Sequence, residues 1–192
     1  MVIDLVETIQ KKLGFSELQK IDPNTQEVKK PENLSSEDYL PQAAIPTVLL
    51  GLYKFSGDKN GNKAILNRTF DGDLLSTIFG KNEDSVVGKV AAYTGTTTDF
   101  ASRKMEEIAR EAISVIKENI PGNGTDSSVR DFLINHRNNI LLYLPAELQI
   151  GSVLDDDTID DRTNKMQGPM SSHMHWLEKF FPSTDRKKEE NF

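Results

Sequence analysis

The sequence predicts an all-α protein, and three observations support this fold class. Apolar residues recur every three to four positions in several segments, which is the period of a helix with one buried face. No segment shows the sustained alternation of apolar and polar residues that a half-buried strand requires. Capping residues stand before several of these segments and glycine follows them, as at helix ends. We therefore expect a single helical domain without a sheet.

The first two predicted helices are separated by a polar connection. A short amphipathic helix is expected before Gly14, and residues 22–33 are polar and typical of an exposed segment. A buried helix is expected from Ser35 to Phe55, because Ser35 supplies a capping hydroxyl and apolar residues follow on one face. Pro46 removes a backbone hydrogen bond inside this helix, so it should kink the helix or divide it in two.

The central part of the chain is expected to form further helices. After a turn at residues 56–62, short helical pieces are predicted around residues 64–66 and 74–80. Asn82 should cap the next helix, which stops at Gly95. Its successor begins after Thr97 or Thr98 and extends to Ile120, with the longest apolar stripe in the chain. That helix is expected to be the central core element and to pair with an antiparallel helix over residues 125–143.

The C-terminal part is expected to leave the helical domain. We predict a domain over residues 1–151, an acidic linker over residues 152–168, an amphipathic docking helix over residues 169–181 and a disordered tail over residues 183–192. The linker prediction depends on the aspartates between 155 and 161. A stripe on the docking helix is the candidate partner-binding site, formed by Met170, His173, Met174, Leu177 and Phe181.

Such a short helix cannot fold alone, because isolated helices below about 12–15 residues are marginal in water. It must bury its stripe against its own domain, against a second copy, or against a partner protein that receives a helix in a groove. Methionine suits all three, since its flexible side chain adapts to irregular surfaces. Protonation of His173, near its ordinary pKa of roughly 6.5, would weaken such docking at low pH.

Charge and composition limit the class of function. Basic residues number 23 and acidic residues 30, giving a net charge of −7, so nucleic acid is not the first partner to expect. The chain has no cysteine, which excludes disulfides and thiolate metal sites and is compatible with a reducing compartment. The N-terminal residues lack the features of a signal peptide, and no apolar run is long enough to span a membrane. We expect a cytoplasmic protein.

Candidate chemical groups each have a simpler structural interpretation. His136 lies on an apolar helix face, where we expect a histidine at the edge of the core with one hydrogen bond. His173 and His175 are two residues apart and cannot share a site on a helix, so packing is favoured over copper binding. The acidic run lacks the glycine and glutamate of a calcium loop. We therefore expect no metal, no cofactor and no enzyme, and a carboxylate-dependent hydrolase would need converging acids.

A DNA-binding regulator is the alternative function. Residues 82–120 form a helix-turn-helix-like pair in which Ala91, Gly95 and Ala101 permit a close crossing. Arg103 and Lys104 would contact phosphates. However, residues 98–120 carry four basic and five acidic side chains, whereas a helix for the major groove should present a basic surface.

The order of residues in this region also resembles a known family. The segment Leu75-Ser76-Thr77-Ile78-Phe79-Gly80, a helix and the turn at Thr94-Gly95 are similar to the YidB-like proteins, a bacterial family without an established function. The resemblance covers residues 74–120 and departs from the family pattern at Arg110, where proline is expected. It implies an all-helical fold and brings no catalytic residues. The leading interpretation is thus a non-catalytic protein-interaction or scaffold module.

Overall fold

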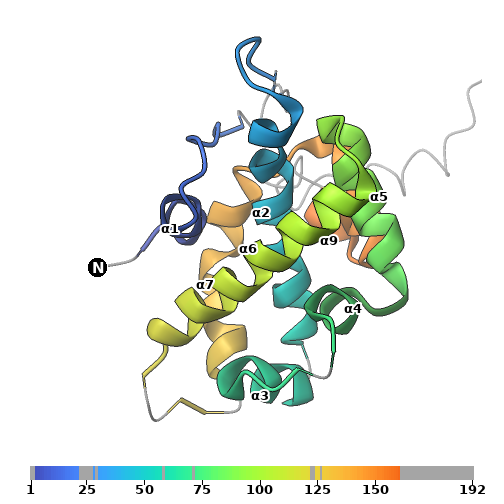
Figure 1. Ribbon diagram of the computed structural model, residues 1–192. Coiled ribbons are helices and arrows are strands. Elements are labelled where there is room, and N and C mark those ends of the chain that lie inside the picture. Colours follow the sequence, from blue (N-terminus) through green and yellow to red (C-terminus); the bar gives the residue numbers. More distant parts are fainter. Residues whose placement is uncertain are drawn as a thin grey trace, which may run out of the picture. The chain divides into compact units, whose positions relative to one another are not determined.

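Helices are the only regular secondary structure in the part of the chain that the computed structural model describes, which is residues 3–21, 28, 30–57, 59–70, 72–121, 124–125 and 127–160. The all-α prediction is therefore confirmed (Figure 1). The helices are α1 (Leu5–Lys12), α2 (Ser36–Phe55), α3 (Lys59–Asn67), α4 (Leu74–Phe79), α5 (Glu83–Thr94), α6 (Thr98–Glu118), α7 (Ser128–Leu141), α8 (Ile150–Val153) and α9 (Asp157–Asp160), with short 3-10 turns at Gly80–Asn82 and Ala146–Leu148.

Helix α2 is the centre of the fold. Every residue from 39 to 52 is buried, because α1, α4, α5, α6 and α7 all pack against this helix. The helix is continuous past Pro46, so the expected division does not occur. The surrounding helices explain this, since packing from every side holds the backbone in place although proline cannot donate its hydrogen bond. The helix predicted to be the central core element, over 98–120, is also part of this core, since eight of its residues, including Ile113, are buried and it packs against α1, α2, α4 and α5.

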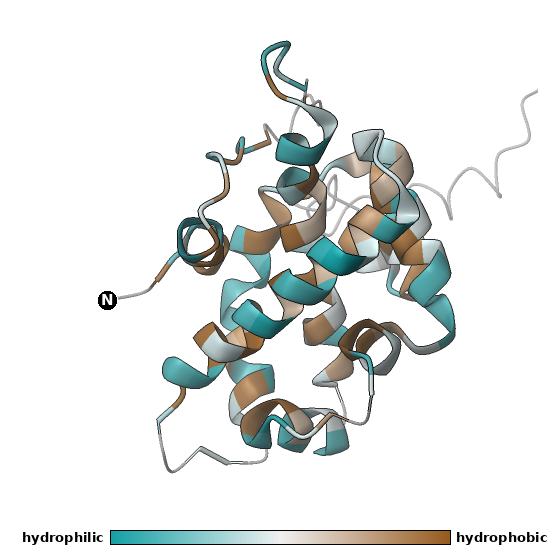
Figure 2. Ribbon diagram, in the orientation of Figure 1, coloured by the Kyte–Doolittle hydropathy of each residue, from teal (hydrophilic) through white to brown (hydrophobic). Residues whose placement is uncertain are grey.

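Helix α6 instead crosses α2 and is buried along one face only (Figure 1). Figure 2 shows polar residues along its other, exposed face. The helix begins as predicted, because the hydroxyl of Thr97 accepts a hydrogen bond from the backbone N–H of Phe100 at 3.2 Å. Helices α6 and α7 both pack on α2 but make few contacts with one another, so they do not form the expected antiparallel pair.

Helices α4 and α5 pack closely against α2. Gly51 permits the approach, because a Cβ there would lie 2.4 Å from Cε1 of Phe79. Asn82 does not cap α5 as predicted: the 3-10 turn before α5 already gives it a helical backbone, with φ −93° and ψ −2°, whereas a capping residue is extended. Its side chain donates instead to the carbonyl oxygen of Val153 at 2.8 Å and so ties α5 to α8.

The compact unit extends to Asp160, not to residue 151. The side chains of Leu154 and Ile159 belong to the core, so residues 152–160 are not the exposed linker that their acidity indicated. Asp160 has a structural role here, because its carboxylate accepts the backbone N–H groups of Gly151 and Ser152 at 2.8 and 2.7 Å. The predicted docking helix at 169–181, the tail and the rest of the linker lie outside the described residues.

Candidate functional site

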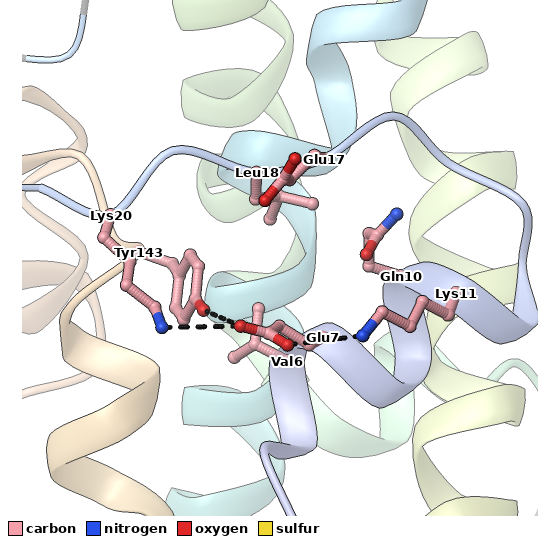
Figure 3. A pocket seen from close by; sticks show the side chains of 8 residues that line it. All are labelled: Val6, Glu7, Gln10, Lys11, Glu17, Leu18, Lys20 and Tyr143. Carbon is pink, nitrogen blue, oxygen red and sulfur yellow. Dashed lines mark hydrogen bonds and ion pairs between the residues drawn. The ribbon is translucent and has the colours of Figure 1, made fainter.

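A surface pocket of about 540 Å³ lies beside α1 (Figure 3). The predicted partner-binding residues all lie outside the described residues, so the structure does not test whether they form one site. They are Met170, His173, Met174, Leu177 and Phe181. The pocket is formed by helix α1, the connection that follows it and the turn that follows α7. Its lining residues are Val6, Glu7, Gln10, Lys11, Glu17, Leu18, Lys20 and Tyr143.

The buried amide of Gln42 on α2 holds two walls of this pocket together. It accepts the backbone N–H of Gln19 at 2.8 Å and donates to the carbonyl oxygens of Gln19 and Tyr143 at 3.1 and 2.9 Å. The N–H of Ile21 also donates to the carbonyl oxygen of Leu142 at 2.7 Å. The connection after α1 therefore adopts a defined path although it contains no helix.

Tyr143 is the most deeply buried polar residue of the pocket and is only 1% exposed. Its hydroxyl lies within hydrogen-bond distance of two carboxylates, 3.1 Å from Glu7 and 3.2 Å from Asp4. Burial raises the pKa of Tyr143, and the two carboxylates raise it further. The phenol therefore stays protonated and acts as a hydrogen-bond donor to an acid, not as a base.

Glu7 lies between the hydroxyl and two lysines. Lys20 lies 3.4 Å from one of its oxygens and Lys11 lies 3.4 Å from the other (Figure 3). The hydrogen bond from Tyr143 is the main cause that lowers the pKa of Glu7, followed by the lysines, while Asp4 opposes them. At the floor of the pocket, the carboxylate of Glu7 is thus ionised, and the two lysines balance its charge. These groups satisfy one another and leave no nucleophile next to a base.

Acceptors remain on the opposite side of the pocket. The amide nitrogen of Gln10 donates to the carbonyl oxygen of Phe15, and Figure 3 shows its amide oxygen turned toward the pocket. The carboxylate of Glu17 lines the same side of the pocket. With Val6 and Leu18 as apolar walls, the pocket is suited to bind a polar side chain or a small polar molecule.

Three acids also converge around the start of α4, which the sequence did not predict. Glu106 accepts the backbone N–H of Leu75 at 2.8 Å and pairs with Arg110 at 3.0 Å. Burial and the neighbouring carboxyl of Asp73 raise the pKa of Glu106, whereas the hydrogen bond with Glu106 lowers the pKa of Asp73. Burial and nearby acids raise the pKa of Glu83. Because Asp73 also accepts the N–H of Ser76, Asp73 and Glu106 together cap α4.

The two residues proposed for DNA contact, Arg103 and Lys104, both lie on α6. Lys104 pairs with Glu107 at 2.8 Å, and Arg103 is exposed on α6. The N-terminal parts of α5 and α6 line a pocket of about 300 Å³ that includes three acids, which would repel phosphate. These acids are Glu83, Asp84 and Asp99.

His136 is a buried structural residue, as expected, but it has two contacts instead of one. Its Nδ1 lies 2.8 Å from the carbonyl oxygen of Phe132, and its Nε2 lies 3.2 Å from that of Ile3. The second contact joins α7 to the segment before α1. Among the described residues, no three acids or histidines are grouped to hold a metal ion.

Comparisons with protein-family models, with curated proteins and with solved structures found no match. The resemblance to the YidB-like proteins therefore remains a prediction. The stretch that carries it corresponds to helices α4, α5 and α6. No helix in the described residues has both the length and the hydropathy needed to cross a bilayer.

Proposed function

We propose that the protein is a non-catalytic interaction module that binds a partner protein through the stripe Met170, His173, Met174, Leu177 and Phe181. One observation carries the proposal. In the described residues, Ile134 is the one large apolar side chain that is clearly exposed, at 48%. The described part of the compact unit thus has few strongly exposed large apolar side chains against which a stripe that cannot fold alone could pack. We therefore propose that the stripe packs into an apolar groove of a partner protein.

The described site supports binding over chemistry. Tyr143, Glu7 and two lysines are bonded to one another, and the Asp73–Glu106 pair caps a helix. These roles count against a carboxylate-dependent hydrolase, and the acids at the N-terminal ends of α5 and α6 count against a DNA-binding regulator. We also propose a cytoplasmic location, with which the lack of cysteine is compatible.

Deletion of residues 168–192 tests this function. The matched variant Leu177→Asp places a charge in the stripe without shortening the chain. We expect both variants to keep the unfolding free energy and the oligomeric state of the full chain, and both to lose a partner that the full chain captures from its source cell. A destabilised monomer would instead mean docking on the chain's own domain. Loss of a dimer in light scattering would mean exchange between copies, and either result would reject the proposal.

A further inference from the structure

A second concave surface lies between α6 and the connection from α3 to α4. We call it the arginine groove, with a volume of about 340 Å³. Its floor is apolar, since Leu74 and Ile113 are 9% and 3% exposed and Phe70 packs against Phe55 with ring centroids 6.4 Å apart. Arg68 and Arg110 form its rim, and Glu111 and Ser114 complete the lining.

Arg68 has a backbone conformation that favours glycine. Its φ is +54°, in the left-handed region, at the position directly after α3. The N–H groups of Arg68 and Thr69 bond back to the carbonyl oxygens of Ile65 and Ala64 at 3.3 and 3.0 Å, which closes the helix. Glycine is the usual residue at such an end because it has no Cβ. A left-handed residue with a long side chain suggests that the side chain itself has a function.

The charge of Arg68 is available to a ligand. Its guanidinium donates to the hydroxyl of Ser114 at 3.0 Å, which is a neutral group. The acids near the groove have other cationic partners: Glu106 pairs with Arg110 at 3.0 Å, while Glu111 and Glu118 pair with Lys12 at 3.2 and 2.8 Å. Glu118 lies close enough for its pKa to be lowered slightly by Arg68, after larger effects of Lys12 and Ser114.

We propose that the arginine groove binds an apolar group that carries a carboxylate, such as an aromatic acid. The ring would lie on Leu74 and Ile113, and the carboxylate would pair with the guanidinium of Arg68, whose planar shape matches a carboxylate. The volume of the groove is within the range of small-molecule sites. This inference goes beyond the proposed function and does not depend on the C-terminal stripe.

An NMR titration of the full chain with 3-phenylpropionate tests the proposal. We expect a Kd on the order of 1 mM, as for a ligand of this size, with shifts of the Leu74 and Ile113 methyl groups and of the Ser114 amide. The neutral analogue 3-phenylpropanamide has the same ring without the charge and should bind about tenfold more weakly. Equal binding of the two ligands, or no shifts at these residues, would overturn the proposal.

Substitutions distinguish a ligand role of Arg68 from a structural one. Arg68→Gly should raise the midpoint of thermal unfolding, because glycine suits the left-handed backbone, while it weakens 3-phenylpropionate about tenfold. Arg110→Gln, at a side chain that is 72% exposed, changes no backbone preference and should weaken the same ligand about threefold. Arg103→Gln removes an arginine of α6 outside the groove and should leave the affinity unchanged. Unchanged affinity in Arg68→Gly, or an equal loss in Arg103→Gln, would reject the site.

Discussion

The carboxylate of Glu106 on α6 accepts the backbone N–H of Leu75, the second residue of α4, at 2.8 Å. The first N–H groups of a helix have no partner within the helix, and the side chain of Leu75 is fully buried. The acceptor therefore comes from a distant part of the chain. This contact fixes the start of α4 on α6.

Glu106→Ala should cost about 1–3 kcal/mol of unfolding free energy, because the N–H of Leu75 loses its acceptor. Glu106→Gln keeps an oxygen at the same place and should cost less than about 1 kcal/mol. Urea denaturation at pH 7 measures both values. Equal costs for the two variants would show that the charge, and not the acceptor, matters.

Two glycines inside helices should respond oppositely to alanine. A Cβ at Gly51 would lie 2.4 Å from the ring of Phe79, so Gly51→Ala must displace α4 or the ring and should cost about 1–3 kcal/mol. A Cβ at Gly88 in α5 meets no atom within 4 Å, so Gly88→Ala should stabilise by about 0.5–1 kcal/mol. Thermal melts of the pair check the prediction, which fails if both shifts have the same sign.

Glu7 should make stability depend on pH on the acid side. The pKa of Glu7 is lowered, first by the hydrogen bond from Tyr143. Its contribution to stability is therefore complete above the unfolded value of about 4.3 and is lost as the pH falls through the lower folded value. The unfolding free energy should fall less steeply below about pH 5 in Glu7→Gln and in Tyr143→Phe than in the unmodified chain. Parallel profiles from pH 7 to 3 would contradict this assignment.

The position of Ile159 tests where the compact unit ends. Its side chain is 0% exposed, so Ile159→Ala should cost about 2–5 kcal/mol, as buried isoleucines do. Ile134→Ala is the matched control, since that side chain is 48% exposed and should cost at most about 0.5 kcal/mol. If denaturant melts gave similarly small losses of unfolding free energy for both variants, residues 152–160 would be an exposed linker after all.

Helix α6 was predictable because its pattern is local: one apolar face, the cap at Thr97 and a polar opposite face. Helix α2 was predicted as buried, but its central position was not, because a helix that is apolar on all sides gives no direction of packing. The acids between 155 and 160 obscured the burial of Leu154 and Ile159, since their composition resembles that of a linker and the capping role of Asp160 depends on α8.

The pocket beside α1 could not be predicted, because it combines residues from distant parts of the chain. Glu7 and Tyr143 are 136 positions apart. The hydrogen bond from Gln42 to the carbonyl oxygen of Tyr143 also joins distant residues, which are 101 positions apart. No local pattern contains such a contact. The stripe at 170–181 is the reverse case, since it is a local pattern whose partner the sequence does not specify.

The burial of α2 on every side also determines how the chain opens. Its backbone hydrogen bonds are reached by solvent only after α1, α4, α5, α6 and α7 have separated from it, and these helices come from both ends of the described chain. The amide protons of residues 48–52 should therefore exchange with deuterium only through global unfolding, at the rate set by the full stability. The backbone of α2 is thus a natural reporter of the cooperativity of the whole compact unit.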